Sequence, residues 1–171
     1  KTGMVLLKTR VPFSGSIVKK VYSEFSFYSF EKSVRIKAVL DMSPEALKNM
    51  TLVLKTQKGE IIVEIKSPSS ETILATSVDV LKSGLNPFKV VLTGKNGKVF
   101  GSKELTIKRL KVQSNESKID HFRRVVSFKG KPYFPFGMYC GGQFSDVKVV
   151  KDAYIKSMTS AKMNMLIAFN G

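Results

Sequence analysis

The chain has 171 residues, 43% of them hydrophobic, which is enough to form a globular core and argues against disorder. Its 29 lysines and arginines outnumber its 13 aspartates and glutamates, giving a formal net charge of +16. The single cysteine, Cys140, excludes an internal disulfide and a cysteine-based zinc site, and no apolar run reaches the length of a membrane-spanning helix. We therefore expect no metal, no cofactor and no membrane span.

Alternation of apolar and polar residues predicts antiparallel strands over most of residues 18–110. In residues 33–41, for example, Val34, Ile36 and Leu40 fall on one face of a strand, with charged residues between them. Further strands are expected at residues 4–9, 17–30 and 72–80, and hairpins with glycine-containing turns across residues 51–66 and 88–110. About seven or eight short strands of this kind are typical of a mainly β fold, an immunoglobulin-like antiparallel β-sandwich. We assign this sandwich to residues 1–111 and expect no helix in it.

The segment YSEFSFYSF, residues 22–30, places several aromatic side chains along one of these strands. Such a row either stacks on sugar rings or fills the sandwich core and covers its edge. The second alternative is the commoner one in antiparallel strands, and the absence of tryptophan argues mildly against a dedicated carbohydrate-binding module.

The pattern changes beyond residue 111. Residues 112–124 are polar and are expected to form a connector, and residues 125–171 then indicate a strand, a helix and a second strand. The helix is expected over residues 145–163, where apolar residues recur every three or four positions. A βαβ unit of this kind implies two parallel strands, the first of them the apolar segment FPFGMY at residues 134–139.

Two motifs mark this expected βαβ unit. FKGKPYFPFGMY, residues 128–139, holds a hairpin turn before the first strand, and AKMNMLIAFN, residues 161–170, ends the helix and enters the second strand. They resemble the NGKP-type turn and the AGFNTV phrase at the junction where an immunoglobulin-like domain is followed by a (β/α)8 TIM barrel in family-two glycoside hydrolases. That group includes β-galactosidase, β-glucuronidase and β-mannosidase. Lys129 stands where the family has asparagine, Ala161 and Asn164 are matched, and the sandwich half is similar only in architecture.

The resemblance implies hydrolysis of a β-linked glycan by two carboxylates, one after the fourth barrel strand and one after the seventh. This chain reaches only the second strand of an incomplete barrel, so no catalytic residue is assigned in it. The 171 residues alone are expected to be inactive and to be the N-terminal part of a glycoside hydrolase-like protein. Its expected partners are carbohydrate and the remainder of its own barrel.

Tyr139 and Asn170 lie at or just past the C-terminal ends of the two expected barrel strands and are the candidate substrate-binding residues. A tyrosine offers a stacking face and a hydroxyl, and an asparagine offers an amide. The alternative is that Tyr139 packs beneath the barrel rim and Asn170 starts a turn. Cys140 and His121 are not expected to form a catalytic dyad, because only their presence in one chain supports it.

Two sequons, Asn49-Met50-Thr51 and Asn115-Glu116-Ser117, make Asn49 and Asn115 candidate glycosylation sites and favour a secreted or lumenal protein. A chain rich in serine and threonine also contains such triplets by chance. The positive charge favours an anionic glycan or acidic polysaccharide as a partner, whereas scattered lysines argue against specific nucleic-acid binding. The alternative function is a non-catalytic structural, adhesive or polyanion-binding protein with the same architecture.

Overall fold

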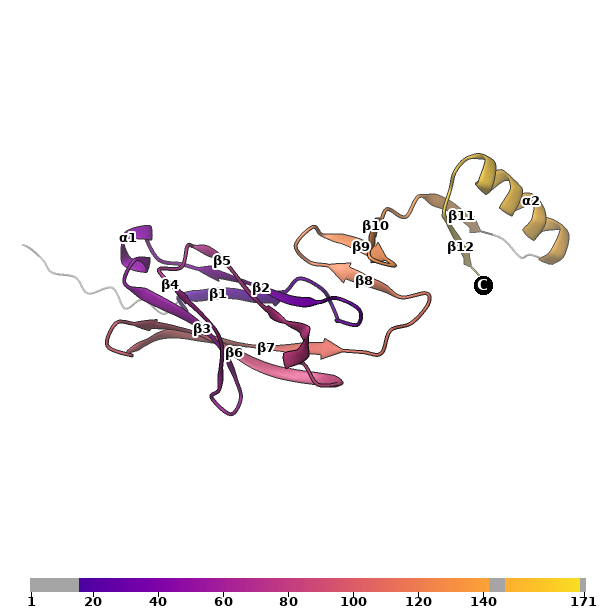
Figure 1. Ribbon diagram of the computed structural model, residues 1–171. Helices are drawn as coiled ribbons and strands as arrows, with labels where there is room; N and C mark the ends of the chain where they lie inside the picture. Colours follow the sequence, from indigo (N-terminus) through magenta and orange to yellow (C-terminus); the bar gives the residue numbers. More distant parts are fainter. Residues whose placement is uncertain (1–15, 142–146, 170–171) are drawn as a thin grey trace, which may run out of the picture.

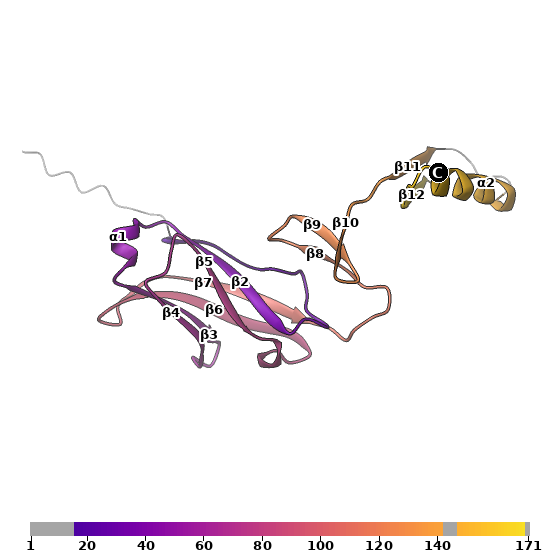
Figure 2. The same cartoon turned by 45° about the horizontal axis from the view of Figure 1, so that its top comes forward.

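The computed structural model describes residues 16–141 and 147–169, and the expected strand at residues 4–9 lies outside them. In this part of the chain the fold is mainly β (Figure 1). A two-sheet sandwich comes first, a small antiparallel sheet follows, and a strand–helix–strand unit comes last. Figures 1 and 2 both place the small sheet between the other two parts.

The sandwich consists of one three-stranded and one four-stranded antiparallel sheet. The first has the order β1-β2-β5, with β1 at Val18–Ser23, β2 at Ser33–Leu40 and β5 at Glu71–Ser77. The second has the order β4-β3-β6-β7, with β3 at Met50–Thr56, β4 at Ile61–Lys66, β6 at Gly84–Gly94 and β7 at Val99–Arg109. The chain thus passes from one sheet to the other after β2, after β4 and after β5, as in an immunoglobulin-like sandwich. The predicted fold class is confirmed.

The core lies between the two sheets, where the inward residues of both meet. In β2 the buried positions alternate with partly exposed ones, as the sequence pattern predicts. Ile36 and Leu74 from the first sheet and Leu52 and Leu92 from the second are all fully buried in one hydrophobic cluster. Burying side chains of this size stabilises the fold by about 1.5–3 kcal/mol each, which makes the cluster the main source of its stability.

Both predicted hairpins are confirmed, and each turn contains a glycine in the left-handed region of backbone conformation. Gly59 has a φ of +88° between β3 and β4, and Gly97 has a φ of +72° between β6 and β7. A residue with a Cβ atom is strained at such angles, so glycine is the natural choice for these turns. The second turn is closed by hydrogen bonds from the Gly94 amide to the Lys98 carbonyl and from the Gly97 amide to the Gly94 carbonyl, both 2.9 Å long.

The prediction of one continuous strand over residues 17–30 is wrong. β1 ends at Ser23, and beyond it only single bridges remain, from Phe25 to Asp120 and from Tyr28 to Arg109. Serine contributes to the break, because its hydroxyl can bond to the local backbone and compete with regular pairing. One example is the Ser23 hydroxyl, which donates to the Phe25 carbonyl at 2.8 Å.

The expectation of a sandwich without helices is also wrong. A short helix, α1 (Pro44–Leu47), joins β2 to β3, and a 3₁₀-helix, η1 (Val78–Val80), follows β5. Both begin after a serine whose hydroxyl accepts a hydrogen bond from the backbone two or three residues later, namely Ser43 for α1 and Ser77 for η1. Each is one turn long, so hydrophobic periodicity could not reveal it.

The polar segment after the sandwich contains a strand that the sequence did not suggest. β8 (Ser117–Asp120) pairs with β9 (Val125–Phe128), which pairs with β10 (Lys131–Tyr133), all antiparallel. The expected turn at Lys129 and Gly130 does join β9 to β10, and both residues have positive φ. The expected connector at residues 112–124 is therefore partly a strand of this small sheet.

The last part of the chain is a parallel βαβ unit. β11 (Gly137–Gly141) and β12 (Met165–Phe169) run parallel, with Tyr139 opposite Ile167, and α2 (Val147–Ser160) connects them. The strand–helix–strand prediction is confirmed, but the first strand begins only at Gly137. Phe134 is 80% exposed and precedes it, so the expectation that all of FPFGMY forms a central strand is wrong. No helix in the described residues is long and apolar enough to cross a membrane.

Candidate functional site

The C-terminal ends of β11 and β12 lie next to each other, as the predicted sugar-binding position requires. Gly141 pairs with Phe169 at this end, and Tyr139 lies two residues before Gly141 in β11. Asn170 lies outside the described residues. The roles of Tyr139 and Asn170 in binding a sugar stay predictions.

The two candidate glycosylation sites are both on the surface. Asn49 follows α1 and is exposed, and Asn115 is exposed just before β8. Ser117, the third residue of the second sequon, is exposed as well. An oligosaccharide could therefore be attached at either asparagine without unfolding the chain, and modification itself stays a prediction.

A buried ion cluster joins the small sheet to the sandwich. The Lys118 ammonium group, from β8, lies 2.6 Å from Glu31 Oε1 and 2.7 Å from Glu116 Oε1, and it also donates to the Ser29 hydroxyl at 2.9 Å. The side chains of Lys118 and Glu116 are only 2% and 3% exposed. We call these four residues the Lys118 cluster. Because buried charges are costly unless they are paired, it makes the position of β8 depend on partners in the segment before β2.

Aromatic rings from that same segment surround the ammonium group. Its nitrogen lies 4.4 Å from the ring centre of Phe30, 4.7 Å from that of Phe27 and 5.7 Å from that of Phe25. A cation at these distances is attracted by the negative faces of aromatic rings. The aromatic segment at residues 22–30 thus holds a lysine of its own chain, and Tyr28 fills the core with no exposed surface.

The Lys118 cluster also lowers the pKa of the Glu116 carboxyl. Burial pushes the pKa of Glu116 upward, but hydrogen bonds from Lys118 and Ser29, together with the lysine charge, outweigh burial and lower the pKa below 4.5. Glu24 behaves in the opposite way, because burial raises its pKa above 4.5 even though Arg35 lies 2.8 Å away. Both carboxylates are ion-paired within the fold, Glu24 with Arg35 and Glu116 with Lys118, so we assign both to structure.

The end of β8 is fixed by a second set of polar contacts. Asp120 is almost fully buried, and its Oδ1 accepts hydrogen bonds from the backbone amides of Phe122 at 3.0 Å and Arg123 at 2.9 Å. The His121 Nδ1 atom lies 3.1 Å from the Ser23 carbonyl oxygen. His121 therefore has a backbone partner at the junction, and a structural role accounts for it.

The side chain of Asn164, the residue before β12, forms hydrogen bonds with the residues just before β11. Its Oδ1 accepts a hydrogen bond from the Phe136 amide at 2.8 Å, and its Nδ2 donates to the Phe134 carbonyl at 2.9 Å. The Tyr133 hydroxyl donates to the Asn164 carbonyl at 2.8 Å. One asparagine thus fixes the three residues between β10 and β11.

A hollow of about 420 Å³ lies beside Asn164 and is lined by Ser117, Val126, Phe128 and Tyr133. Asn164 and Tyr133 come just before β12 and β11, so this hollow lies near the N-terminal ends of the two parallel strands. Ligands of parallel α/β folds bind at the opposite ends. We therefore assign the hollow to the packing of the small sheet against the βαβ unit.

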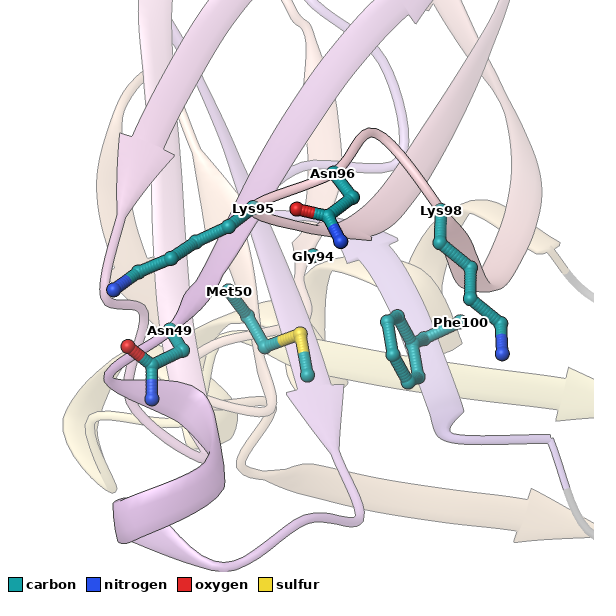
Figure 3. Close-up of a pocket in the computed structure, with 7 residues that line it drawn as sticks. All are labelled: Asn49, Met50, Gly94, Lys95, Asn96, Lys98 and Phe100. Carbon is teal, nitrogen blue, oxygen red and sulfur yellow. The ribbon is translucent and has the colours of Figure 1, made fainter.

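A different pocket opens at the far end of the sandwich, between the turn that follows α1 and the turn between β6 and β7 (Figure 3). It encloses about 340 Å³, and we call it the turn pocket. Its lining combines two amides, two ammonium groups, one aromatic ring, one thioether and a glycine, contributed by Asn49, Asn96, Lys95, Lys98, Phe100, Met50 and Gly94. Pairing of Met50 with Gly94 across β3 and β6 brings the two turns together. The sequence did not reveal this pocket.

The described residues offer no metal centre: nowhere in residues 16–141 and 147–169 do three histidine, cysteine, aspartate or glutamate side chains gather in a way that could hold an ion. The turn pocket has no carboxylate in its lining, so it lacks a general acid and a general base of the kind that glycoside hydrolysis uses. What its groups can do is bind a polar, negatively charged ligand.

The chain is similar in structure to solved β-glucuronidase structures from Ruminococcus gnavus. For the apo enzyme the sequence identity is 13% and the TM-score 0.37, with 87% of this chain and 25% of that chain covered. The complex with D-glucuronic acid gives 15% identity, a TM-score of 0.37 and the same coverage. The complex with uronic isofagomine at 1.3 Å resolution gives 14% identity, a TM-score of 0.38 and coverage of 87% and 24%. This chain thus spans about a quarter of the length of those structures. No family model matches it, and no curated protein matches it in sequence.

Proposed function

We propose that the chain is the N-terminal part of a glycoside hydrolase-like protein that acts on a β-linked, anionic glycan. The observation that carries the proposal is the order of elements: an antiparallel sandwich, a hairpin, and then a parallel pair of strands joined by a helix. The motifs around Lys129 and Asn164, which resemble those of family-two glycoside hydrolases, lie at the matching places in this order.

The parallel pair itself supports a larger barrel. Parallel strands in proteins are covered on both faces and rarely occur as an isolated pair, because each free edge exposes unpaired amides and carbonyls. Further βα units closing a (β/α)8 barrel would cover β11 and β12 and would supply the two catalytic carboxylates. In this arrangement the remainder of the barrel is the first partner of the chain, and the sandwich is an accessory domain that braces it.

Within such a barrel this chain would contribute to binding. Tyr139 and Asn170 would contact the sugar from the C-terminal ends of β11 and β12, and the Lys118 cluster would hold the sandwich and the small sheet in a fixed relation. Proton transfer and nucleophilic attack would come from residues after Gly171.

The test is a hydrolysis assay with the complete natural polypeptide and with the 171-residue chain, using chromogenic β-glucuronide, β-galactoside and β-mannoside. We expect turnover by the complete protein, fastest on the anionic glucuronide, and none by the chain alone. In the complete protein, Asn170→Ala should raise KM more than it lowers kcat. Turnover by the 171-residue chain would contradict the placement of the carboxylates, and a complete protein inactive on all three glycosides would contradict the proposal.

A non-catalytic polyanion-binding protein is the second candidate, favoured by the net charge of +16. Binding of this kind depends on counterion release and weakens steeply with salt. The candidate predicts retention on immobilised heparin that is lost as the salt concentration rises. Retention that does not respond to salt would exclude it.

The chain is further proposed to come from a secreted or lumenal glycoprotein, with Asn49 and Asn115 as acceptors. Both are exposed, which glycosylation requires. Expression through a secretory pathway, followed by enzymatic deglycosylation and mass spectrometry, should reveal an attached glycan at one or both sites. A protein that carries no glycan at either asparagine would contradict this part of the proposal.

A further inference from the structure

The turn pocket lies at the end of the sandwich opposite to the βαβ unit, so it cannot belong to the sugar site expected at the ends of β11 and β12. In Figure 1 the β6–β7 turn and α1 lie at one end of the molecule, and β11, α2 and β12 lie at the other. The pocket is therefore a separate feature that needs its own explanation.

We propose that the turn pocket is an accessory binding site for an acidic pyranose, a hexuronate unit of a glycan. The choice of a sugar over other anions rests on the proposed function, but the choice of an acidic ligand rests on the pocket. Two ammonium groups, from Lys95 and Lys98, lie on opposite sides of its rim without a carboxylate in the lining to neutralise them (Figure 3), and that of Lys98 lies 5.6 Å from the centre of the Phe100 ring. A ligand carboxylate would find a charge-assisted hydrogen bond at either of them.

The other lining groups fit the neutral part of the same ligand. The side chains of Asn49 and Asn96 come from the two facing turns and present amides, which donate to and accept from hydroxyl groups (Figure 3). Phe100 keeps 36% of its surface exposed; Lys98 lies along one side of its ring, and the side toward Met50 forms an apolar wall suited to the C–H face of a pyranose (Figure 3). A volume of about 340 Å³ is sufficient for one sugar unit.

The absence of a side chain at Gly94 leaves room for the Phe100 ring. A Cβ atom on Gly94 would lie 2.8 Å from the Phe100 ring, a separation that carbon atoms do not tolerate. Any side chain at this position must therefore push the ring away from its present position. Gly94→Ala consequently alters the pocket without changing a charge, which separates the shape of the site from its electrostatics.

Occupation by a sugar ligand and glycosylation of Asn49 exclude each other. The Asn49 amide lines the pocket, and an oligosaccharide attached to it would fill the opening. The binding test therefore uses unglycosylated protein made in bacteria. Asn115 lies outside the pocket lining, and its modification has no effect on this inference.

The experiment is an NMR titration of the isotope-labelled 171-residue chain with D-glucuronate, with D-glucose and sodium sulfate in parallel. We expect glucuronate to shift the amide signals of the β6–β7 turn with a dissociation constant on the order of 1 mM, because one sugar unit makes few contacts. Lys95→Gln with Lys98→Gln should weaken binding about tenfold or more, and Gly94→Ala should weaken it as well.

The matched control is the double variant Lys58→Gln with Lys108→Gln. It also removes two positive charges, but from exposed lysines outside the pocket lining. It should bind glucuronate as the unchanged chain does. Equal loss in both double variants would overturn the proposal, because binding would then follow net charge alone. It would also be overturned by no shifts at about 20 mM glucuronate, by equal shifts with glucose, or by equal shifts with sulfate. The assay involves no hydrolysis, so its failure is distinguishable from failure of the proposed enzyme function.

Discussion

Replacing Lys118 by methionine should release the small sheet from the sandwich. Methionine keeps much of the length of lysine but removes the charge that neutralises Glu31 and Glu116, whose side chains are 12% and 3% exposed. Two carboxylates would then remain in a largely buried site without their cation, and the rings of Phe27 and Phe30 would lose theirs. Breaking a buried ion pair by removing one partner costs about 3–5 kcal/mol, and we expect Lys118→Met to fall in this range.

Amide hydrogen exchange measures this loss at the place where it occurs. The Ser26 amide donates to the Ile119 carbonyl at 3.0 Å, and the His121 amide donates to the Glu24 carbonyl at 2.7 Å, so both report docking of β8. A loss of 3 kcal/mol corresponds to exchange faster by about 100-fold. Core amides of β6 should stay protected, which distinguishes undocking from global unfolding.

Two further variants make this test decisive. Lys58→Met removes an exposed lysine and should leave exchange unchanged, since surface substitutions usually cost less than about 0.5 kcal/mol. Adding Glu116→Gln to Lys118→Met should recover part of the lost protection, because one of the two uncompensated charges is removed. Protection at Ser26 and His121 within about threefold of the unchanged chain in Lys118→Met would refute the reasoning.

The loss of stability in acid should depend on Glu116, because the pKa of this carboxyl is lowered in the folded chain. Its contribution to the free energy of unfolding is therefore complete above pH 4.5 and is lost as the pH falls through the folded pKa. In Glu116→Gln the urea-unfolding midpoint should therefore fall less steeply between about pH 5 and 3 than in the unchanged chain. The control Glu45→Gln, at an exposed position, should leave this slope unchanged. An unchanged slope in Glu116→Gln would count against the ion pair. Asn164→Ala removes the side-chain hydrogen bonds of 2.8 and 2.9 Å to the segment before β11, so hydrogen exchange at the Phe136 amide should become at least about tenfold faster. Equal exchange in Asn164→Ala and in the control Ser160→Ala would contradict the role of Asn164 in fixing this segment. Gly137→Ala would drive a Cβ atom into the Met165 carbonyl group, so β12 amides should lose protection while β6 amides keep theirs. Intact β12 protection would show that the two strands do not approach so closely.

The regular strands of the sandwich were predictable because their signals are local. In β2 every second residue is apolar, and in the two hairpins a glycine stands where the turn needs a positive φ. The parallel pair was predictable for a similar reason, since a helix of about four turns separates two short apolar segments. Patterns of this kind are complete within twenty or thirty residues.

β8 could not be predicted, because its burial depends on residues far away in the chain. Glu116, Lys118 and Asp120 alternate like the polar face of an exposed strand or connector, yet they point to the buried side. Their partners include Ser29 and Glu31, almost ninety residues earlier. No local rule separates a charged residue with a distant partner from one in solvent.

The turn pocket is hidden in the sequence for the same reason. Asn49 follows a helix of a single turn, and Lys95 to Phe100 belong to a hairpin; each segment alone is typical of an exposed turn. They form one pocket only because Met50 pairs with Gly94 in the sheet. The sequence did indicate the ends of β11 and β12 as a binding position, because that conclusion needs only the order of elements.

The parallel pairing of β11 with β12 is the central structural claim, and interstrand backbone NOEs test it most directly. The 171-residue chain, at 19.0 kDa, is small enough for this measurement. A parallel pair predicts contacts that link Gly137 with Met165 and Gly141 with Phe169. Contacts that link Gly137 with Phe169 and Gly141 with Met165 would mean an antiparallel pair and would contradict the barrel-like βαβ unit on which the proposed function rests.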